Sequence, residues 1–472
     1  PPPTTPPNRV ASMPESPIVY RRRPASSPSA PSANGSSSAA AETKQAGLAA
    51  RTALRRGFWG SQHPMVHRTV IVATFLALTV VTDALAPTSD EASLLEAFIP
   101  RSVFRAVLIT WVSASLFTYD PAYAYPYTLA FTVPLVTMYF AHLGCYHMVV
   151  LQVFGVIPAL ELVSPKNHFD LTREEENQLR SMRSFRYITW IWVPLQLAHI
   201  VWGMYVASAW GLSRSQLALL TASIGISTGG LGINFAHELI HKPTKLEKGL
   251  GRILLASVCY GSFYVEHLYG HHRHVSTPHD PASARYSESL YAFLPRTLVG
   301  SFRSACHIAA ARCVKAGVPV LSLSNEVYSL LAVSAGMAVC AWAIFGALGL
   351  GMFFGQSAVA ILLLEIVNYI EHFGLARKPS DKYEGEFEPV TPIHSWNSTA
   401  CITDLFLLNL QRHSHHHAKA GDRYQILHSY DDYEAPQMPT GYAGMMLLAL
   451  VPPLWFAVMR PRVDALRERN LL

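Results

Sequence analysis

Long apolar blocks alternate with shorter polar segments along most of this chain. A helix needs about 20 mostly apolar residues to span a bilayer. The blocks that approach or reach this length are 67–86, 103–118, 125–143, 146–164, 187–208, 215–236, 327–348 and 352–371. Neither 187–208 nor 215–236 contains Asp, Glu, Lys or Arg, and a short polar turn joins them. The pattern therefore predicts an all-α, polytopic transmembrane helical bundle with a helical hairpin over 187–236.

The segments that follow these blocks are more mixed. Residues 251–265 are apolar but too short to span, so we expect them to lie at the interface or to be buried. Residues 273–326 predict a mixed polar loop with short helices, and 374–440 are polar and rich in histidine. A final apolar piece at 441–459 contains two consecutive prolines, and 464–472 is expected to be a C-terminal tail.

The first 65 residues differ from the rest of the chain. They are rich in Pro, Ser and Ala, with scattered Arg and only two acids, Glu15 and Glu42. This composition does not support a hydrophobic core and predicts disorder. An Arg-rich, Ser-rich and acid-poor segment is also typical of an organellar transit peptide. A disordered tail and a transit segment both stay open.

Composition supports the membrane interpretation. Half of the residues are hydrophobic and 14% are charged, whereas soluble domains carry about 25% charged residues. The net charge of +6 fits an anionic lipid surface better than nucleic acid, because no stripe of basic and aromatic residues stands out. The six cysteines form no CxxC pair and are expected to be small buried side chains.

Nine histidines gather in four clusters where apolar blocks meet polar segments. They are His237, His241, His267, His271, His272, His372, His413, His416 and His417. Imidazole is a good ligand for iron, zinc and copper, and residues four apart share one helix face, with Cβ atoms about 5–6 Å apart. The pairs His237/His241, His267/His271 and His413/His417 have that spacing. Each of these clusters is expected to chelate, and because nine ligands are too many for one ion, the pattern predicts two metals near one membrane face.

The first cluster permits another interpretation. His237, Glu238 and His241 match the His-Glu-x-x-His signature of zinc metalloproteases, but such a protease needs one further ligand and not seven. A non-enzymatic metal carrier is a third class. Zinc has no redox chemistry, so two imidazole-bound metals beside a bilayer favour O2 activation on apolar molecules with unactivated C–H bonds.

Acidic residues are expected to support the histidines. Glu238, Glu266 and Glu371 each adjoin one of the nine, but neighbours on a helix point about 100° apart. We therefore expect these acids to accept N–H bonds from histidines on other helices, and we expect the same of Asp280 and Asp404. Other nearby residues predicted to be supporting or solvated are Asp422, His274, His279, His394 and His415.

Seven short segments carry a specific resemblance. They are NFAHELIHK at 234–242, EHLYGHH at 266–272, TPHDPAS at 277–283, NYIEHFGL at 368–375, HSWNS at 394–398, LQRHSHHHA at 410–418 and PTGY at 439–442. With them the chain resembles the membrane alkane 1-monooxygenase (alkane ω-hydroxylase) family, within the wider fatty-acid desaturase/hydroxylase-like superfamily. The resemblance runs from about residue 125 to residue 463, and the motif around His372 separates this family from plain desaturases.

The resemblance implies a nonheme di-iron site on a six-helix membrane core, with all nine histidines as iron ligands. It implies hydroxylation of the terminal methyl of alkanes or related alkyl chains with O2. Electrons would come from a separate rubredoxin and its NAD(P)H-dependent reductase. Residues 66–124, with one or two extra apolar spans, lie outside the resemblance. Hydroxylation or desaturation of fatty acyl, terpene or alkylbenzene substrates is the alternative within this chemistry.

The chain departs from the family pattern at three positions. His415 stands where Asp is usual, Phe373 stands where Tyr is usual, and Glu161 is often Asp. None of these changes removes a ligand. A substrate channel between helices is expected to admit a chain end first. Three small residues either leave room for this channel or allow close helix packing, and they are Gly229, Gly230 and Gly232.

Overall fold

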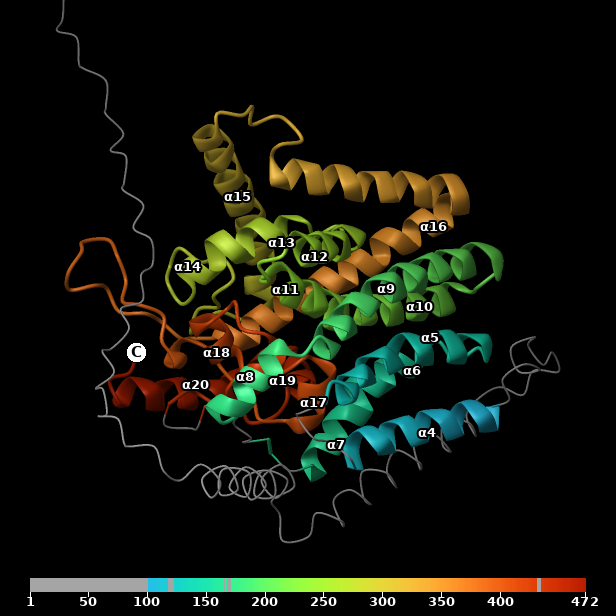
Figure 1. The fold of residues 1–472 in the computed structure, drawn as a ribbon, viewed down its shortest axis with the longest axis horizontal. Helices are drawn as coiled ribbons and strands as arrows, with labels where there is room; N and C mark the ends of the chain where they lie inside the picture. The colour runs from blue at the N-terminus through green and yellow to red at the C-terminus, as the bar shows by residue number, and fades with distance from the viewer. Residues whose placement is uncertain (1–100, 118–122, 165, 168–170, 431–433) are drawn as a thin grey trace, which may run out of the picture. The chain divides into compact units, whose positions relative to one another are not determined.

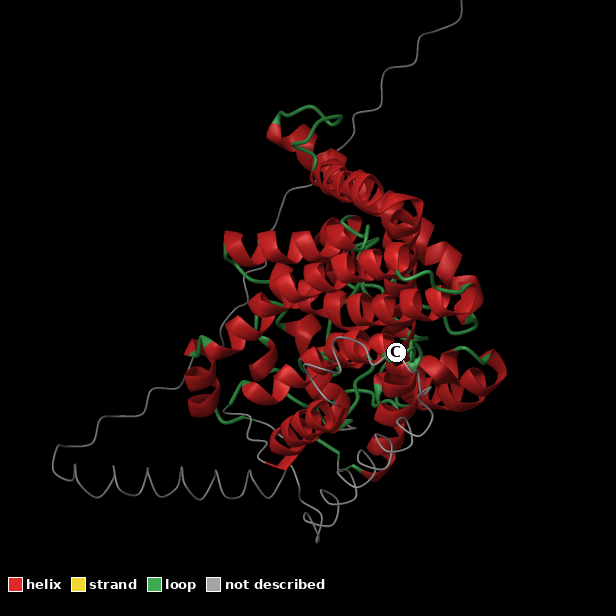
Figure 2. Ribbon diagram, turned by 90° about the vertical axis from the view of Figure 1, so that its right-hand side faces the viewer, coloured by secondary structure: helices red, strands yellow, loops and turns green. Residues whose placement is uncertain are grey.

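The computed structural model describes residues 101–117, 123–164, 166–167, 171–430 and 434–472. Within these residues the regular elements are helices, and only isolated β-bridges accompany them. Figure 2 shows this part of the chain as helices joined by loops. The predicted all-α class is therefore confirmed. The expected disordered tail at 1–65 and the apolar block at 67–86 lie outside the described residues.

Two of the long apolar helices form the predicted hairpin. Helix α9 (Ser184–Ala209) is followed after a short turn by α10 (Arg214–Ile226). The turn ends at Ser213, whose hydroxyl accepts from the backbone N–H of Gln216 while Gln216 caps the Ser213 N–H in return. This reciprocal capping box satisfies backbone groups that the first helical turn leaves free. Figure 1 shows α9 and α10 lying side by side.

The second helix of the hairpin continues to the polar region. It runs through a π-helix, η3 (Ser227–Ile233), into α11 (Asn234–Ile240). Residues 214–240 and α9 are both long and apolar enough to cross a membrane. The chain is therefore an integral membrane protein in which a spanning helix leads directly to the first histidine cluster.

The third spanning helix is α16 (Glu326–His372), which joins the blocks 327–348 and 352–371 into one element. Its two arms meet at Gly346, where φ is 65° and ψ is −160°. Only glycine adopts this conformation readily. Figure 1 shows the resulting bend, after which the second arm passes α9 and α10.

Close packing against α16 and α9 explains two of the small residues in η3. A Cβ at Gly229 would lie 2.4 Å from the Cα of Ala360 on α16, and a Cβ at Gly232 would lie 2.0 Å from Oε1 of Gln196 on α9. Glycine at these positions lets the helices approach each other. The hypothesis that they leave room for a substrate channel is wrong for Gly229 and Gly232, while Gly230 faces open space.

The described apolar blocks before α9, from residue 101 on, are also helical. They form α4 (Arg101–Phe117), then η1 (Tyr125–Phe131) with α5 (Thr132–His142), and then α6 (Met148–Leu151), η2 (Gln152–Val156) and α7 (Ile157–Val163). A polar helix, α8 (Arg173–Ser181), connects this part to α9 and begins with a capping box at Thr172.

The expectation for 273–326 is wrong, because α15 (Leu290–Ala316) is a 27-residue helix. Ser289 caps its first turn and Gly317, with φ of 68°, ends it. Its buried face recurs every three or four residues and includes Phe293, Thr297 and Ser301. The outward face carries arginines and other polar residues, so the segment does not stand out as an apolar block.

The remaining helices surround the ends of the spanning helices. Residues 251–265 comprise the end of α12 (Lys245–Ser257), a turn and α13 (Ser262–Val265), and they are largely buried. Short elements follow: η4 (Glu266–His271), α14 (His272–His274), η5 (Pro392–His394), α17 (Cys401–Phe406), α18 (His413–Ala418) and η6 (Tyr424–Ile426). The last helices are α19 (Tyr442–Ala449) and α20 (Pro452–Glu468), so the chain stays helical beyond residue 463.

Candidate metal centre

The nine histidines come together in two adjacent groups. The first group is His237, His241, His267, His272 and His416, and the second is His271, His372, His413 and His417. Within each group one nitrogen per residue lies within 4.8 Å of the corresponding nitrogens of the others. The groups adjoin, since the ring centroids of His272 and His417 are 4.6 Å apart. Four segments that are distant in the sequence therefore build one centre.

The ring nitrogens of the first group face one another at short range. The Nε2 atoms of His237 and His416 are 2.9 Å apart, and those of His241 and His267 are also 2.9 Å apart. His272 Nε2 lies 3.0 Å from His267 Nε2 and 3.1 Å from His416 Nε2. Five Nε2 atoms thus point to a common centre.

The second group has the same inward arrangement. His413 Nε2 lies 3.3 Å from His372 Nε2 and 3.0 Å from His417 Nε2. The Nε2 atom of His271 is buried and has no hydrogen-bond partner in the described part of the chain. A buried polar nitrogen without a partner is costly unless a ligand satisfies it, so the structure itself indicates a ligand here.

The π-helical geometry of η4 determines how its histidines are divided between the two groups. His267 and His271 were expected to share an ion, but they belong to different groups. They lie in η4, whose backbone hydrogen bonds run from residue i to i+5. The wider turn brings His267 together with His272, five residues later, and turns His271 to the other group. In α18 the pair His413/His417 does share a group, as expected.

The spacing of the nitrogens fits a metal ion. At metal–nitrogen distances of about 2.1 Å, two ligands at right angles lie about 3.0 Å apart, close to the separations in both groups. Burial lowers the pKa of His267, His272 and His416 well below its ordinary value. These imidazoles are therefore neutral and offer a lone pair, which metal binding requires.

Asp280 orients one ligand candidate. The Nδ1–H of His271 donates to Asp280 Oδ2 over 2.9 Å, which leaves Nε2 facing the second group. Burial tends to raise the pKa of the Asp280 carboxyl, but His271 and the hydroxyl of Ser283, 2.6 Å away, lower it overall. An ionised carboxylate thus fixes the imidazole in the tautomer needed for binding through Nε2.

A carboxyl and a backbone carbonyl contact two histidines of the second group. Glu371 accepts from the hydroxyl of Tyr442 over 2.8 Å, and its other oxygen lies 3.3 Å from His413 Nε2. His372 donates from Nδ1 to the backbone carbonyl of His394 over 3.3 Å. No sequence pattern points to this carbonyl, because any residue type supplies one.

The other expected supporting acids have different partners. Glu238 forms an ion pair with Lys242 over 3.0 Å and lies 3.4 Å from the backbone N–H of Tyr424. Asp404 accepts from Asn167 over 2.9 Å and from Gln411 over 3.0 Å. Within the described residues neither carboxylate bonds to a histidine. Both tie the polar region to neighbouring segments.

The histidines expected to be supporting or solvated lie outside both groups. His415 is 3.4 Å from Asp422 and stacks on His428, with ring centroids 4.8 Å apart. His394 caps η5 through the N–H of Thr391 and lies 3.2 Å from Glu388. His274 and His279 lie near each other, with ring centroids 6.0 Å apart. The substitution at His415 therefore faces Asp422 rather than the proposed ligands.

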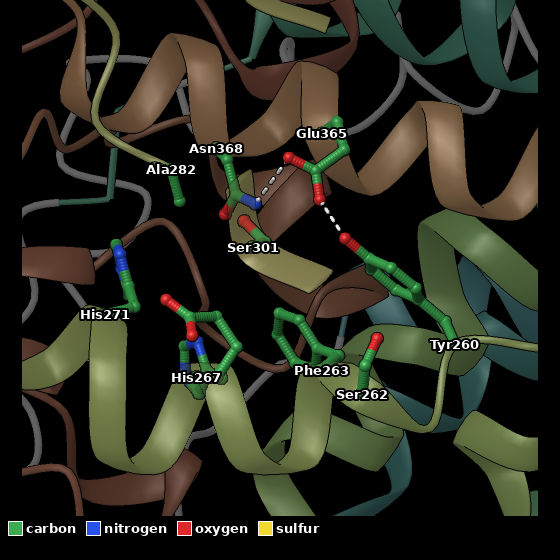
Figure 3. Close-up of a pocket in the computed structure, with 10 residues that line it drawn as sticks. Tyr260, Ser262, Phe263, His267, His271, Ala282, Ser301, Glu365 and Asn368 are labelled. Carbon is green, nitrogen blue, oxygen red and sulfur yellow. Dashed lines mark hydrogen bonds between the residues drawn. The ribbon is translucent and has the colours of Figure 1, made fainter. Parts of the chain in front are cut away.

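A small pocket opens beside both groups. Figure 3 shows His267 and His271 on one side of it and Glu365, Asn368 and Tyr260 on the other. Sequence reasoning did not single out Glu365. The available signal was an acid in the middle of the apolar block 352–371, because ionisable residues within membrane spans are expensive and usually functional.

Comparisons with known proteins bear on what the centre does. The fatty acid desaturase family model matches residues 213–449, which contain all nine histidines. Alkane 1-monooxygenase 2 of Pseudomonas aeruginosa is 45% identical over 328 residues, covering 67% of this chain and 84% of that protein. The chain belongs to the alkane 1-monooxygenase family.

Further relatives range from almost as similar to clearly more distant. Alkane 1-monooxygenase 2 of Alcanivorax borkumensis is 43% identical over 326 residues, which is 68% of this chain and 83% of that protein. The hydroxylase component of xylene/toluene monooxygenase from Pseudomonas putida is 28% identical over 247 residues, covering 52% and 63% of the two chains. The predicted family is confirmed, and the protein is a membrane alkane hydroxylase of the desaturase-like superfamily. Family membership and the histidine groups together indicate iron.

Proposed function

We propose that each histidine group holds one iron ion and that the protein hydroxylates the terminal methyl of alkanes or related alkyl chains with O2. The observation that carries this proposal is the convergence of nine ring nitrogens into two adjacent groups. It is supported by relatives named alkane 1-monooxygenase. Iron, when bound, supplies the redox chemistry that activates O2. One oxygen atom enters the alcohol and the other leaves as water, with uptake of two electrons and two protons.

The residues of the chain prepare the centre for this chemistry. Nine neutral imidazoles bring no negative charge, so they leave the charge of two cations unbalanced in a buried site. Buried acids offset that charge from a distance, and the structure has Asp280 and Glu371 at the second group and Glu266 and Glu365 along the pocket. This arrangement suits a cation that cycles between oxidation states.

A single zinc site explains the structure less well. A metalloprotease built on His237, Glu238 and His241 leaves the second group without a role. Moreover, Glu238 is engaged by Lys242 and lies near the N–H of Tyr424, so it is not free to act as a base on a zinc-bound water.

We also propose that the substrate enters from the bilayer. His237 lies in the last part of the span 214–240, and His372 is the last residue of α16. The centre therefore lies at the ends of spanning helices, within reach of a lipid-dissolved alkyl chain. Terpenes, fatty acyl chains and the methyl of an alkylbenzene are competing substrates, and the 28% identical xylene/toluene relative favours including the last of these in any test.

The proposed electron donor is a rubredoxin that is reduced by an NAD(P)H-dependent rubredoxin reductase. The decisive experiment combines the full chain in liposomes with both proteins, isotopically labelled O2 and a panel of n-alkanes and methylbenzenes. We expect one labelled oxygen atom in a primary alcohol, together with about two irons per chain. Stoichiometric zinc with activity retained, or no oxygenated product from any substrate, would overturn the proposal.

A further inference from the structure

The pocket beside the histidine groups contains an acid that the proposed metal centre does not use as a ligand. Glu365 lies in the second arm of α16, seven residues before His372, and its residue surface is 1% exposed. Its carboxyl accepts from the hydroxyl of Tyr260, from Thr297 Oγ1 over 2.7 Å and from Asn368 Nδ2 over 3.3 Å. Figure 3 shows the contacts to Tyr260 and Asn368.

The buried position of Glu365 is energetically unfavourable for a carboxyl group. The described hydrogen-bond partners of Glu365 are all uncharged, although the acid is buried within a membrane-spanning helix. Burying a carboxyl group is unfavourable, either as an ion without a cation partner or as a neutral acid removed from water. Replacing the acid by an apolar residue would avoid this cost. A carboxyl in this position therefore indicates a use beyond helix packing.

The pocket connects this carboxyl to both histidine groups. His267 of the first group and His271 of the second group line it, and the hydroxyls of Ser262 and Ser301 add polar atoms to the wall. The pocket has room for about one water molecule. A water held there would face polar atoms on several sides, which is the condition for an ordered buried water.

Protons have to reach the centre for the proposed reaction to balance. Hydroxylation of one C–H bond by O2 takes up two electrons and two protons and releases one water. The electrons come from the external one-electron donor. The alkyl substrate supplies no net proton, and neutral imidazoles bound through Nε2 have none to spare. The protons must therefore pass through other groups that reach the centre from solvent.

We infer that Glu365 is the proton-transfer residue of this centre, which takes up a proton and passes it through the pocket water toward the two histidine groups. This inference rests on the proposed function. Its role is one of positioning a proton, since Glu365 contacts neither proposed ligand directly. The other titratable groups that line the pocket are Tyr260, Glu266, His267 and His271. His271 is committed to Asp280, and Glu266 adjoins His267 in η4.

The test uses the full chain with its electron donor and reductase and compares three variants. Glu365→Gln keeps the size of the side chain but carries no exchangeable carboxyl proton. Glu365→Asp keeps the carboxyl on a shorter side chain. Ser357→Ala is the matched control, because Ser357 is a buried polar residue of the same helix that bonds to the backbone of Phe353 and does not line the pocket.

General acid–base groups typically contribute about 10²–10⁴-fold to rate. We expect Glu365→Gln to bind as much iron as the unaltered protein but to form alcohol at least about tenfold more slowly, with more of the consumed O2 released as hydrogen peroxide. Glu365→Asp should recover much of the alcohol yield and show a larger solvent deuterium isotope effect. Ser357→Ala should resemble the unaltered protein in iron content, alcohol formation, peroxide release and solvent isotope effect.

A second readout needs no metal or substrate. Infrared spectra of the metal-free protein should contain a carboxylic-acid C=O band that shifts in D2O and is absent in Glu365→Gln. The inference is overturned if this band is missing, if Glu365→Gln retains full coupling of O2 use to alcohol, or if that variant loses its iron. If the unaltered protein forms no alcohol, the proposed function fails instead, and the infrared result still decides the proton assignment.

Discussion

Two ligand candidates, His271 and His372, face the centre with Nε2 and bond to the protein through Nδ1, and His271 is the clearer case. Its Nδ1–H is held by Asp280, which Ser283 and the backbone N–H of Ala282 hold in turn. Partners of this kind typically change metal affinity or activity by about 10–100-fold.

Asp280→Asn should therefore lower the rate of alcohol formation by about 10–100-fold and reduce the iron content toward one ion per chain. The amide carries no charge to stabilise the required tautomer of His271. Iron analysis and product assays check this result. Asp464→Asn is the control, since Asp464 contacts Tyr286 near the C-terminus and should leave both quantities unchanged. Full iron content and full activity in Asp280→Asn would contradict the proposed role.

Loss of single ligands should separate the two groups. We expect His416→Ala to deplete the first group and His271→Ala or His372→Ala to deplete the second, and all three to abolish oxygenation while the protein stays in the membrane. His307→Ala, which removes an exposed histidine of α15, should retain iron and activity. Iron stoichiometry and Mössbauer spectra of each variant provide the measurement. A His372→Ala protein with both irons and full activity would remove His372 from the ligand set.

For single residues, the sequence predicted which histidines converge better than it predicted which of them share a group. Clustered histidines at the ends of apolar blocks were sufficient to select the nine residues that converge. The division into groups was not available, because the spacing rule assumes an α-helix and η4 is a π-helix. The main-chain partner of His372 and the buried position of Glu365 depend on segments that only the fold brings together.

At the scale of elements, the kink in α16 positions the centre relative to the spans. Gly346 lies at φ 65° and ψ −160°, and nothing lies within 4 Å of a Cβ added there. The position therefore needs glycine for its backbone conformation and not for space. A non-glycine residue in such a region costs of order 1–3 kcal/mol.

Gly346→Ala should lower the unfolding free energy in detergent by about 1–3 kcal/mol. Gly336→Ala is a matched control in the same element, since it is helical, and a Cβ there also meets nothing within 4 Å. Alanine is favoured over glycine within a helix, so this control should be at least as stable as the unaltered protein. Thermal unfolding of the two variants compares them directly, and equal stability would show that Gly346 is under no backbone constraint.

Element boundaries followed from the sequence where the apolar pattern was simple. Helices α9, α10 and both arms of α16 correspond to uninterrupted apolar blocks. Helix α15 was missed because only one of its faces is buried, and its other face carries residues such as Arg296 and Arg312. A helix of this kind resembles a polar connector until the surface it covers is known.

At the scale of the whole molecule, we propose that residues 125–463 form the catalytic unit and that 1–65 contribute nothing to the chemistry. Truncation of residues 1–60 should leave the iron content and the rate of alcohol formation within about twofold of the full chain, because a low-complexity segment adds little to a packed core. Its cellular location is the property that should change if the segment is a transit peptide. A truncated protein that is correctly located and holds its iron but is inactive would contradict this assignment.

The position of hydroxylation follows from how the centre meets the membrane. Two of the ligand candidates, His237 and His372, lie at the ends of the spans 214–240 and 326–372, and Gly229 and Gly232 are closed off by packing against α16 and α9. A chain arriving from the bilayer therefore has to enter a tightly packed helical region, which favours a narrow passage that admits a chain end first. Geometry then selects the terminal carbon despite its stronger C–H bond, since positioning alone lowers an activation barrier by several kcal/mol (about 7–11 at most).

We expect a primary alcohol as the main product from a linear alkane, because end-first entry brings the terminal carbon to the centre. Gas chromatography and mass spectrometry measure this product. Mainly internal alcohols would contradict end-first entry, and an alkene from a saturated chain would place the protein closer to the desaturases.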